Sequence, residues 1–130
     1  FRSKENHKSL KLDIFKSLDN NNLFDKKFDA IIVDPPALAK SLNQKETAIK
    51  QYINLNRFAL KNLKSGGFLF SSSCTSIIKQ NDFEFIIYQA ALKEKIKISV
   101  LEKRLNSPDH PINPFFDEGT YLKFYVIYKY

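Results

Sequence analysis

With 130 residues, 43% of them hydrophobic, the chain is long enough for one domain with a real core and too short for two. It has no signal peptide and no apolar run of bilayer length, and its single Cys cannot form an internal disulfide, so we expect a cytoplasmic protein without a membrane span. The net charge of +7 favours a polyanionic partner such as RNA or DNA, although the Lys-rich composition of an AT-rich genome produces the same balance.

The first clear element is the short apolar run FDAIIV at residues 28–33, a pattern typical of a buried strand. Asp-Pro-Pro follows at residues 34–36, and the prolines end the strand because they donate no backbone hydrogen bond. Apolar residues then return at helical spacing from Gln44 to Leu63. The glycines of KSGG, residues 64–67, are available for a left-handed cap of this predicted helix.

The second half of the chain continues the alternation of strands and helices. FLFSSS at residues 68–73 reads as a strand, and Asn81 with Glu84 resembles a capping box that opens the next helix. IKISVLEK at residues 96–103 alternates as a strand does, a proline-rich loop covers residues 106–118, and TYLKFYVIYKY at residues 120–130 is the last strand. This order predicts an α/β fold with a mostly parallel sheet.

In such a sheet, ligands bind beyond the carboxyl ends of the strands. Three stretches are therefore expected on one rim: DPPALAKS (residues 34–41), SSSCTS (residues 71–76) and NSPDHPINP (residues 106–114).

Three longer segments resemble a known family when they are taken in order. They are FDAIIVDPPALAKS (residues 28–41), QYINLNRFALKNLKSGGFLFSSSCTS (residues 51–76) and SPDHPINPFFDEGTYLKFYVIY (residues 107–128). From about Leu10 onwards the chain resembles the catalytic domain of bacterial large-subunit (23S-type) rRNA cytosine-C5 methyltransferases. The resemblance implies S-adenosylmethionine (SAM) as the cofactor, rRNA as the partner, and a Rossmann-like class I methyltransferase sheet with an antiparallel last strand.

One departure from the family is large, because no glycine-rich turn precedes Asp-Pro-Pro in this chain. Residues 1–130 therefore correspond to the C-terminal half of such a catalytic domain, without its first two strands and without the family's N-terminal RNA-binding domains. The chain begins at Phe1 and contains no Met, so we interpret it as a piece of a longer protein or as a processed product.

The resemblance implies catalytic roles for Cys74 and Asp34. In the family, the cysteine at the position of Cys74 attacks C6 of the cytosine, which turns C5 into a nucleophile for the methyl group. Asp34 would contact N3 and the amino edge of the base, and Pro35 and Pro36 would hold it rigidly. The alternatives are ordinary structural roles: a small buried thiol for Cys74 and a turn carboxylate for Asp34.

The expected binding residues also follow from the resemblance. Asp13, Asp34 and Pro35 are expected at the cofactor, although Asp13 is equally well explained as the N-cap of a short helix, IFKSL. Contacts with the RNA are expected from the following residues: Pro36, Lys40, Ser41 and His110. A solvated loop explains Lys40 and Ser41 equally well, and His110 is either a proton acceptor or a structural loop residue. Tyr52 and Asn56 match a helix of the family and either contact the site or merely pack beside it.

Two rival functions remain at this point. The first is methylation of an amino group, but enzymes of that kind carry an aromatic residue after Asp/Asn-Pro-Pro, whereas this chain has Ala37 and Leu38. Alternatively, the chain is a non-catalytic remnant that binds RNA or another protein. The missing first strand also leaves residues 28–33 at an edge of the sheet. Either the N-terminal segment folds back and pairs with this edge, or two chains pair through it as a homodimer, which is the outcome we expect.

Overall fold

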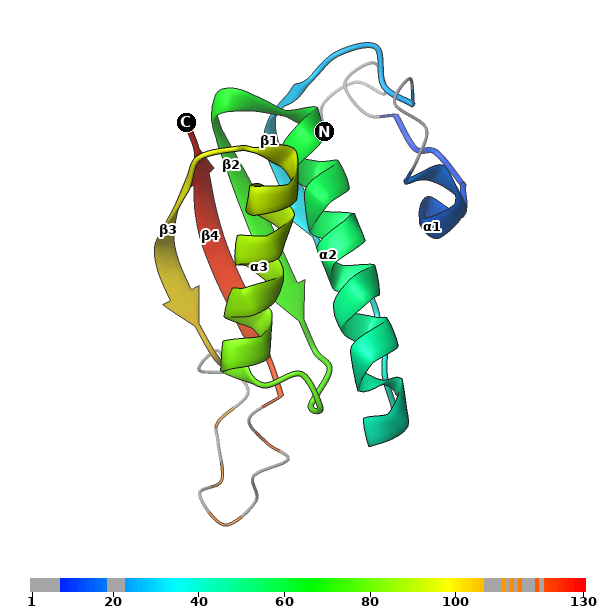
Figure 1. Ribbon diagram of the computed structural model, residues 1–130, viewed down its shortest axis with the longest axis vertical. Helices are drawn as coiled ribbons and strands as arrows, with labels where there is room; N and C mark the ends of the chain where they lie inside the picture. Colours follow the sequence, from blue (N-terminus) through cyan, green and yellow to red (C-terminus); the bar gives the residue numbers. More distant parts are fainter. Residues whose placement is uncertain are drawn as a thin grey trace, which may run out of the picture.

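The computed structural model describes residues 8–18, 23–106, 111, 113, 115, 119 and 121–130. Its four strands form one sheet in the order β1-β2-β4-β3, and two long helices lie over one face of that sheet (Figure 1). The elements in chain order are α1 (Ile14–Ser17), β1 (Phe28–Val33), η2 (Leu42–Gln44), α2 (Lys45–Asn62), β2 (Leu63–Ser73), α3 (Gln80–Glu94), β3 (Ile98–Arg104) and β4 (Lys123–Lys129).

The strand directions confirm the predicted fold class. β1 and β2 are parallel, and β4 is antiparallel to both of its neighbours, β2 and β3. The last strand is therefore inserted between β2 and β3, so that three strands run one way and β4 runs the other. Helices α2 and α3 connect the parallel strands, as in other α/β domains.

The two faces of the sheet differ in what covers them. Along β4, the side chains of Lys123, Tyr125, Ile127 and Lys129 are buried, and the three residues between them are only half-buried. Because successive strand residues point to opposite faces, the buried set faces α2 and α3. In the described part of the chain no helix covers the other face, where Phe70 and Phe124 stack with their ring centroids 6.3 Å apart.

The core lies between the helices and the covered face of the sheet. Three buried aromatic rings form its centre: Phe83 of α3 meets Tyr125 of β4 edge to face at 5.1 Å and Tyr52 of α2 at 6.1 Å. Aliphatic side chains from both helices and from β2 and β4 fill the space around them, among them Leu60, Leu69, Ile86, Ile87 and Ile127. Burial of this apolar surface holds the two helices on the sheet.

The prediction of a buried strand at residues 28–33 was wrong, whereas its position at an edge of the sheet is confirmed. β1 is the outermost strand, and Ile32 is 75% exposed. Only Ile31 and Val33 pack against the core, because only one face of the sheet carries helices. The apolar sequence of β1 suits a strand that is covered on both faces and paired on both sides.

The predicted glycine cap of α2 was also wrong. The helix ends at Asn62, and the next residue, Leu63, is already extended and begins β2. Gly66 instead has a φ of +80° within β2, where glycine carries no steric penalty. Gly67 lets β2 approach β1 closely, since an added Cβ would lie 2.8 Å from the carbonyl oxygen of Asp29.

The capping box of α3 was predicted at the wrong residues. The helix begins at Gln80, so Asn81 and Glu84 lie inside it. The observed cap uses Asp82, whose carboxylate accepts from the backbone N–H of Lys79 at 2.8 Å. Asp82 also pairs with Lys45 of α2 at 2.7 Å, which ties the starts of the two helices together.

Candidate functional site

The carboxyl ends of β1 and β2 bring Asp34 and Cys74 to adjacent positions on one rim. The hydroxyl of Ser72, the last residue but one of β2, donates to the carboxylate of Asp34. Cys74 directly follows β2, and its sulfur lies 3.9 Å from the carbonyl oxygen of Pro35. Parallel neighbouring strands end at the same edge of a sheet, which is why residues about 40 positions apart meet here.

A buried polar network supports the loops that carry Asp34 and Cys74. The hydroxyl of Tyr52 accepts from Ser73 at 3.0 Å and lies 2.8 Å from the hydroxyl oxygen of Thr75. Thr75 in turn accepts from the backbone N–H of Leu38 at 3.1 Å. Burial raises the pKa of Tyr52, so the phenol stays protonated and is free to donate to Thr75. Helix α2 therefore links the loop after Asp-Pro-Pro to the turn after Cys74.

Asn56, one helical turn beyond Tyr52, is fully buried and supports the same region. Its amide donates to the backbone carbonyl of Tyr52 at 2.9 Å and accepts from Ser71 of β2 at 2.7 Å. These contacts use the side chain within the core, so the structure places Asn56 beneath the rim as a packing residue.

Lys123 is a feature of the rim that sequence reasoning missed. Its ammonium is buried and donates to three backbone carbonyls, those of Thr75, Ile78 and Tyr121. Burial, together with the positive charge of nearby Lys79, lowers the pKa of Lys123 to about 8. The period-two pattern of KFYVIYK offered a signal, because it places this lysine on the same face as Tyr125 and Ile127.

The remaining expected site residues have ordinary local contacts. Asp13 is the N-cap of α1, where its carboxylate accepts from the backbone N–H groups of Phe15 and Lys16. The side chain of Lys40 is exposed, and Ser41 is the N-cap of η2 with its hydroxyl bonded to Asn43. Pro36 is exposed. His110 lies outside the described residues.

Asp34 lines two pockets, one on each side of β1. The first, of about 440 Å³, follows the free edge of β1 and is walled by Ile14, Phe24 and Pro35 among others. The second, of about 540 Å³, lies on the uncovered face of the sheet and includes Ser72, Phe70 and Arg104. Neither pocket is lined by Cys74. Within the described residues, no group of three or more His, Cys, Asp or Glu side chains is arranged to hold a metal ion.

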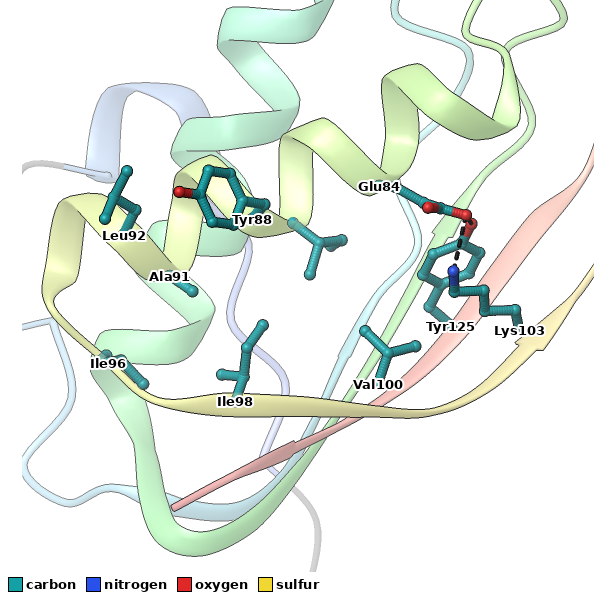
Figure 2. A pocket seen from close by; sticks show the side chains of 10 residues that line it. Glu84, Tyr88, Ala91, Leu92, Ile96, Ile98, Val100, Lys103 and Tyr125 are labelled. Atoms are coloured by element: carbon teal, nitrogen blue, oxygen red, sulfur yellow. Dashed lines mark hydrogen bonds and ion pairs between the residues drawn. The ribbon is translucent and has the colours of Figure 1, made fainter.

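A third pocket, of about 480 Å³, lies between α3 and β3 and contains none of the expected site residues (Figure 2). Its walls are apolar, with Leu92 and Tyr88 of α3 facing Ile98 and Val100 of β3. One end is closed by Glu84, which pairs with Lys103 at 2.8 Å and accepts from Tyr125 at 3.1 Å. The hydrogen bond from Lys103 lowers the pKa of Glu84, so its carboxylate remains charged.

The chain is similar to methyltransferases both in its fold and in its sequence. A solved methyltransferase, SMU.776, crystallised with SAH, matches 92% of this chain and 30% of its own length with a TM-score of 0.72 and 26% identity. The chain has a methyltransferase fold. It is also 35% identical to the ribosomal RNA large subunit methyltransferase I of Shewanella frigidimarina over 85% of its residues. The protein of the same name from Aeromonas salmonicida is 35% identical over 94%.

These matches cover only part of each relative. The chain spans 28% of the Shewanella protein and 31% of the Aeromonas protein, so it corresponds to about a third of their length. No protein-family model matches the chain. In the described part of the chain, none of the helices has the length and apolar character needed to cross a membrane.

Proposed function

We propose that this chain is the C-terminal part of the catalytic domain of a SAM-dependent rRNA methyltransferase, and that the complete protein methylates C5 of a cytosine. The observation that carries the proposal is the convergence of Asp34 and Cys74 at the ends of two neighbouring parallel strands. The rRNA methyltransferases to which the chain is similar support the substrate class, and the net charge of +7 suits a polyanion.

The chemistry assigns distinct tasks to the two residues. The thiolate of Cys74 adds to C6 of a cytosine that has been taken out of its stack, and the electron pair moves onto C5. Asp34 holds the base at N3 and the amino group. Once C5 carries the methyl group, loss of the C5 proton to a base restores the double bond and expels the thiolate. His110 is our candidate for that base, since its ordinary pKa suits proton transfer near neutral pH.

The residues present fit one part of the cofactor. The pocket on the free edge of β1 combines apolar walls with the carboxylate of Asp34, and Asp13 directly precedes one of its lining residues, Ile14. Such walls suit an adenine ring, and carboxylates suit its amino group and the ribose. When bound, SAM supplies the methyl group. The glycine-rich turn that approaches the methionine end of the cofactor in the family has no counterpart before β1 in this sequence.

Methylation of an amino group is the less favoured alternative. It calls for an aromatic ring after Asp-Pro-Pro to stack on the base, and here that place is taken by Ala37 and Leu38. Leu38 is half-buried and its backbone N–H is bonded to Thr75, so this part of the loop packs against the turn after Cys74.

The decisive test is methyl transfer by the complete protein that contains this chain, with tritium-labelled SAM and large-subunit rRNA. Cys74→Ala is expected to lower the rate at least ~1000-fold, because no other thiol is present in the chain to form the adduct. Ser76→Ala, which removes an exposed hydroxyl two residues later, is the matched control and should stay within about twofold of wild type.

RNA that contains 5-fluorocytosine separates the two methylation chemistries. Fluorine at C5 cannot leave as a proton does, so the wild-type protein should remain covalently attached to this RNA, whereas Cys74→Ala should not. Near-normal methylation by Cys74→Ala, or methyl found on the cytosine amino group, would contradict the C5 mechanism. A complete protein that binds rRNA but transfers no methyl group would favour the non-catalytic alternative.

A further inference from the structure

Lys123 occupies an unusual position for a lysine at the start of a strand. The residue is 2% exposed, and its ammonium donates to the carbonyl oxygens of Thr75 at 2.7 Å, Ile78 at 2.5 Å and Tyr121 at 2.7 Å. A lysine ammonium has three donors, so all of them are used. Lysines at such places ordinarily extend their charge into water, because burying an ion is costly.

Two of the three acceptors belong to the turn that directly follows Cys74. The backbone N–H of Ile78 also donates to the carbonyl of Thr75 at 3.1 Å, which closes residues 75–78 into a turn. Lys123 of β4 therefore donates hydrogen bonds to both ends of this turn, while Tyr52 of α2 is hydrogen-bonded to the side chain of Thr75. Cys74 lies between the end of β2 and Thr75, the residue that Lys123 and Tyr52 both bind.

Burial and three neighbouring residues determine the pKa of Lys123. Burial is the main effect that lowers the pKa of Lys123, and Lys79 acts in the same direction. Cys74 and Asp82 both raise it. Asp82 is already paired with Lys45 of α2 at 2.7 Å and accepts from the backbone N–H of Lys79, so its carboxylate is engaged by other groups.

We propose that Lys123 is a positioning residue for Cys74: it fixes the turn that presents the sulfur and keeps a buried positive charge beside it, which promotes the thiolate. For its role in catalysis the proposal rests on the proposed function. The effect of Lys123 on the reactivity of the Cys74 thiol does not rest on it, because that reactivity can be measured without any methyl transfer. Failure of the positioning role and failure of the methyltransferase assignment are therefore separate results.

The test uses the single Cys of the chain, so that alkylation by iodoacetamide reports on Cys74 alone. Its rate is measured from pH 6 to pH 10 in the wild type and in Lys123→Met, Lys123→Arg and Lys129→Met. Lys129 is the matched control, because it is a second buried lysine of β4 that donates to backbone carbonyls, those of Leu60 and Leu63, at the opposite end of the strand.

Lys123→Met is expected to slow alkylation at pH 7 by about threefold to tenfold and to move the midpoint of the pH profile upwards. Lys123→Arg should return the midpoint towards that of the wild type, because the charge is kept. Lys129→Met should leave the midpoint unchanged. A merely structural role would change the rate by one factor at all pH values. An unchanged midpoint in Lys123→Met, or an equal shift in Lys129→Met, would overturn the proposal.

A reciprocal measurement decides the matter if Lys123→Met does not fold. Cys74→Ala removes the thiol and leaves the lysine cage intact, and the titration of Lys123 is followed by NMR of its side-chain carbon next to the ammonium. Without the neighbouring thiolate, the midpoint for Lys123 should fall by ~0.5 pH unit or more. A midpoint identical in Cys74→Ala and wild type would show that the two groups are not coupled.

Discussion

At the residue scale, the buried charge of Lys123 has a consequence for stability that depends on pH. Its pKa is about 8 in the folded chain against an ordinary value of 10.5. Below pH 8 the lysine is charged in both states, and the full cost of burying the charge is present. Between about pH 8 and 10.5 the unfolded chain binds more protons than the folded chain, so stability rises with pH.

We therefore predict that raising the pH from 7 to 9.5 stabilises the wild type by ~2 kcal/mol relative to Lys123→Met. The comparison removes the contribution of those titrating groups that do not interact with Lys123. The measurement is urea unfolding followed by circular dichroism at the two pH values. A difference that stays constant, or that changes in favour of the variant, would show that Lys123 does not carry a buried charge at pH 7.

A second prediction at this scale concerns the close approach of β1 and β2 at Gly67. Gly67→Ala should destabilise the chain by ~1–3 kcal/mol, because the new Cβ would lie 2.8 Å from a backbone oxygen of β1 and 2.9 Å from the side chain of Leu63. Gly119→Ala is the control, since its nearest described atom is 3.9 Å away, and it should stay within ~0.5 kcal/mol. Equal unfolding midpoints for the two variants would contradict the packing at Gly67.

At the scale of elements, β1 combines an apolar sequence with a position at the edge of the sheet. It lies at an edge, pairs on one side with β2, and exposes Ile32 on the face without helices. No proline interrupts residues 28–33, although Asp29 lies near the start of the strand, where it pairs with Lys64 at 2.7 Å. Unprotected edges recruit other strands. We propose that two chains pair through this edge as a symmetric dimer.

Sedimentation at micromolar concentration tests that dimer. Ile32→Lys should shift the chain towards the monomer, because a charged lysine on an apolar edge strand opposes the burial that accompanies edge-to-edge pairing. Leu42→Lys makes the same change at a residue of η2 that is 79% exposed, and it should leave the association unchanged. A wild-type chain that remains a monomer at this concentration would rule out pairing through β1.

At the scale of the whole molecule, both long helices lie on one face of the sheet, and the chain spans about a third of the relatives it resembles. We predict that this chain alone binds SAM more weakly than ~100 µM, because the pocket at β1 offers apolar walls and a carboxylate without a glycine-rich turn. Isothermal titration calorimetry measures this, with the complete protein as the positive control. Micromolar affinity for the 130-residue chain would contradict the prediction.

The order of strands and helices and the rim that carries Asp34 and Cys74 followed from the sequence alone. These features depend on near neighbours: proline after an apolar run ends a strand, and alternation over residues 123–129 predicts a strand whose odd-numbered side chains share a face. Helix ends were less predictable. The glycines at residues 66 and 67 serve the contact with β1 and do not cap α2, because a neighbouring strand needs that space.

Only the tertiary structure decided what surrounds Cys74. Two of the three carbonyls that hold Lys123 lie 48 and 45 positions earlier in the chain, and they reach it because β4 inserts between β2 and β3. Read locally, a lysine at the start of a strand is a solvent-exposed residue. Lys123 is buried because the turn that follows β2, residues 75–78, lies next to it. The position of that turn is set by packing between segments that are distant in the sequence. For the same reason an apolar run predicts a buried strand at β1, whereas its exposure depends on which partners the fold places beside it.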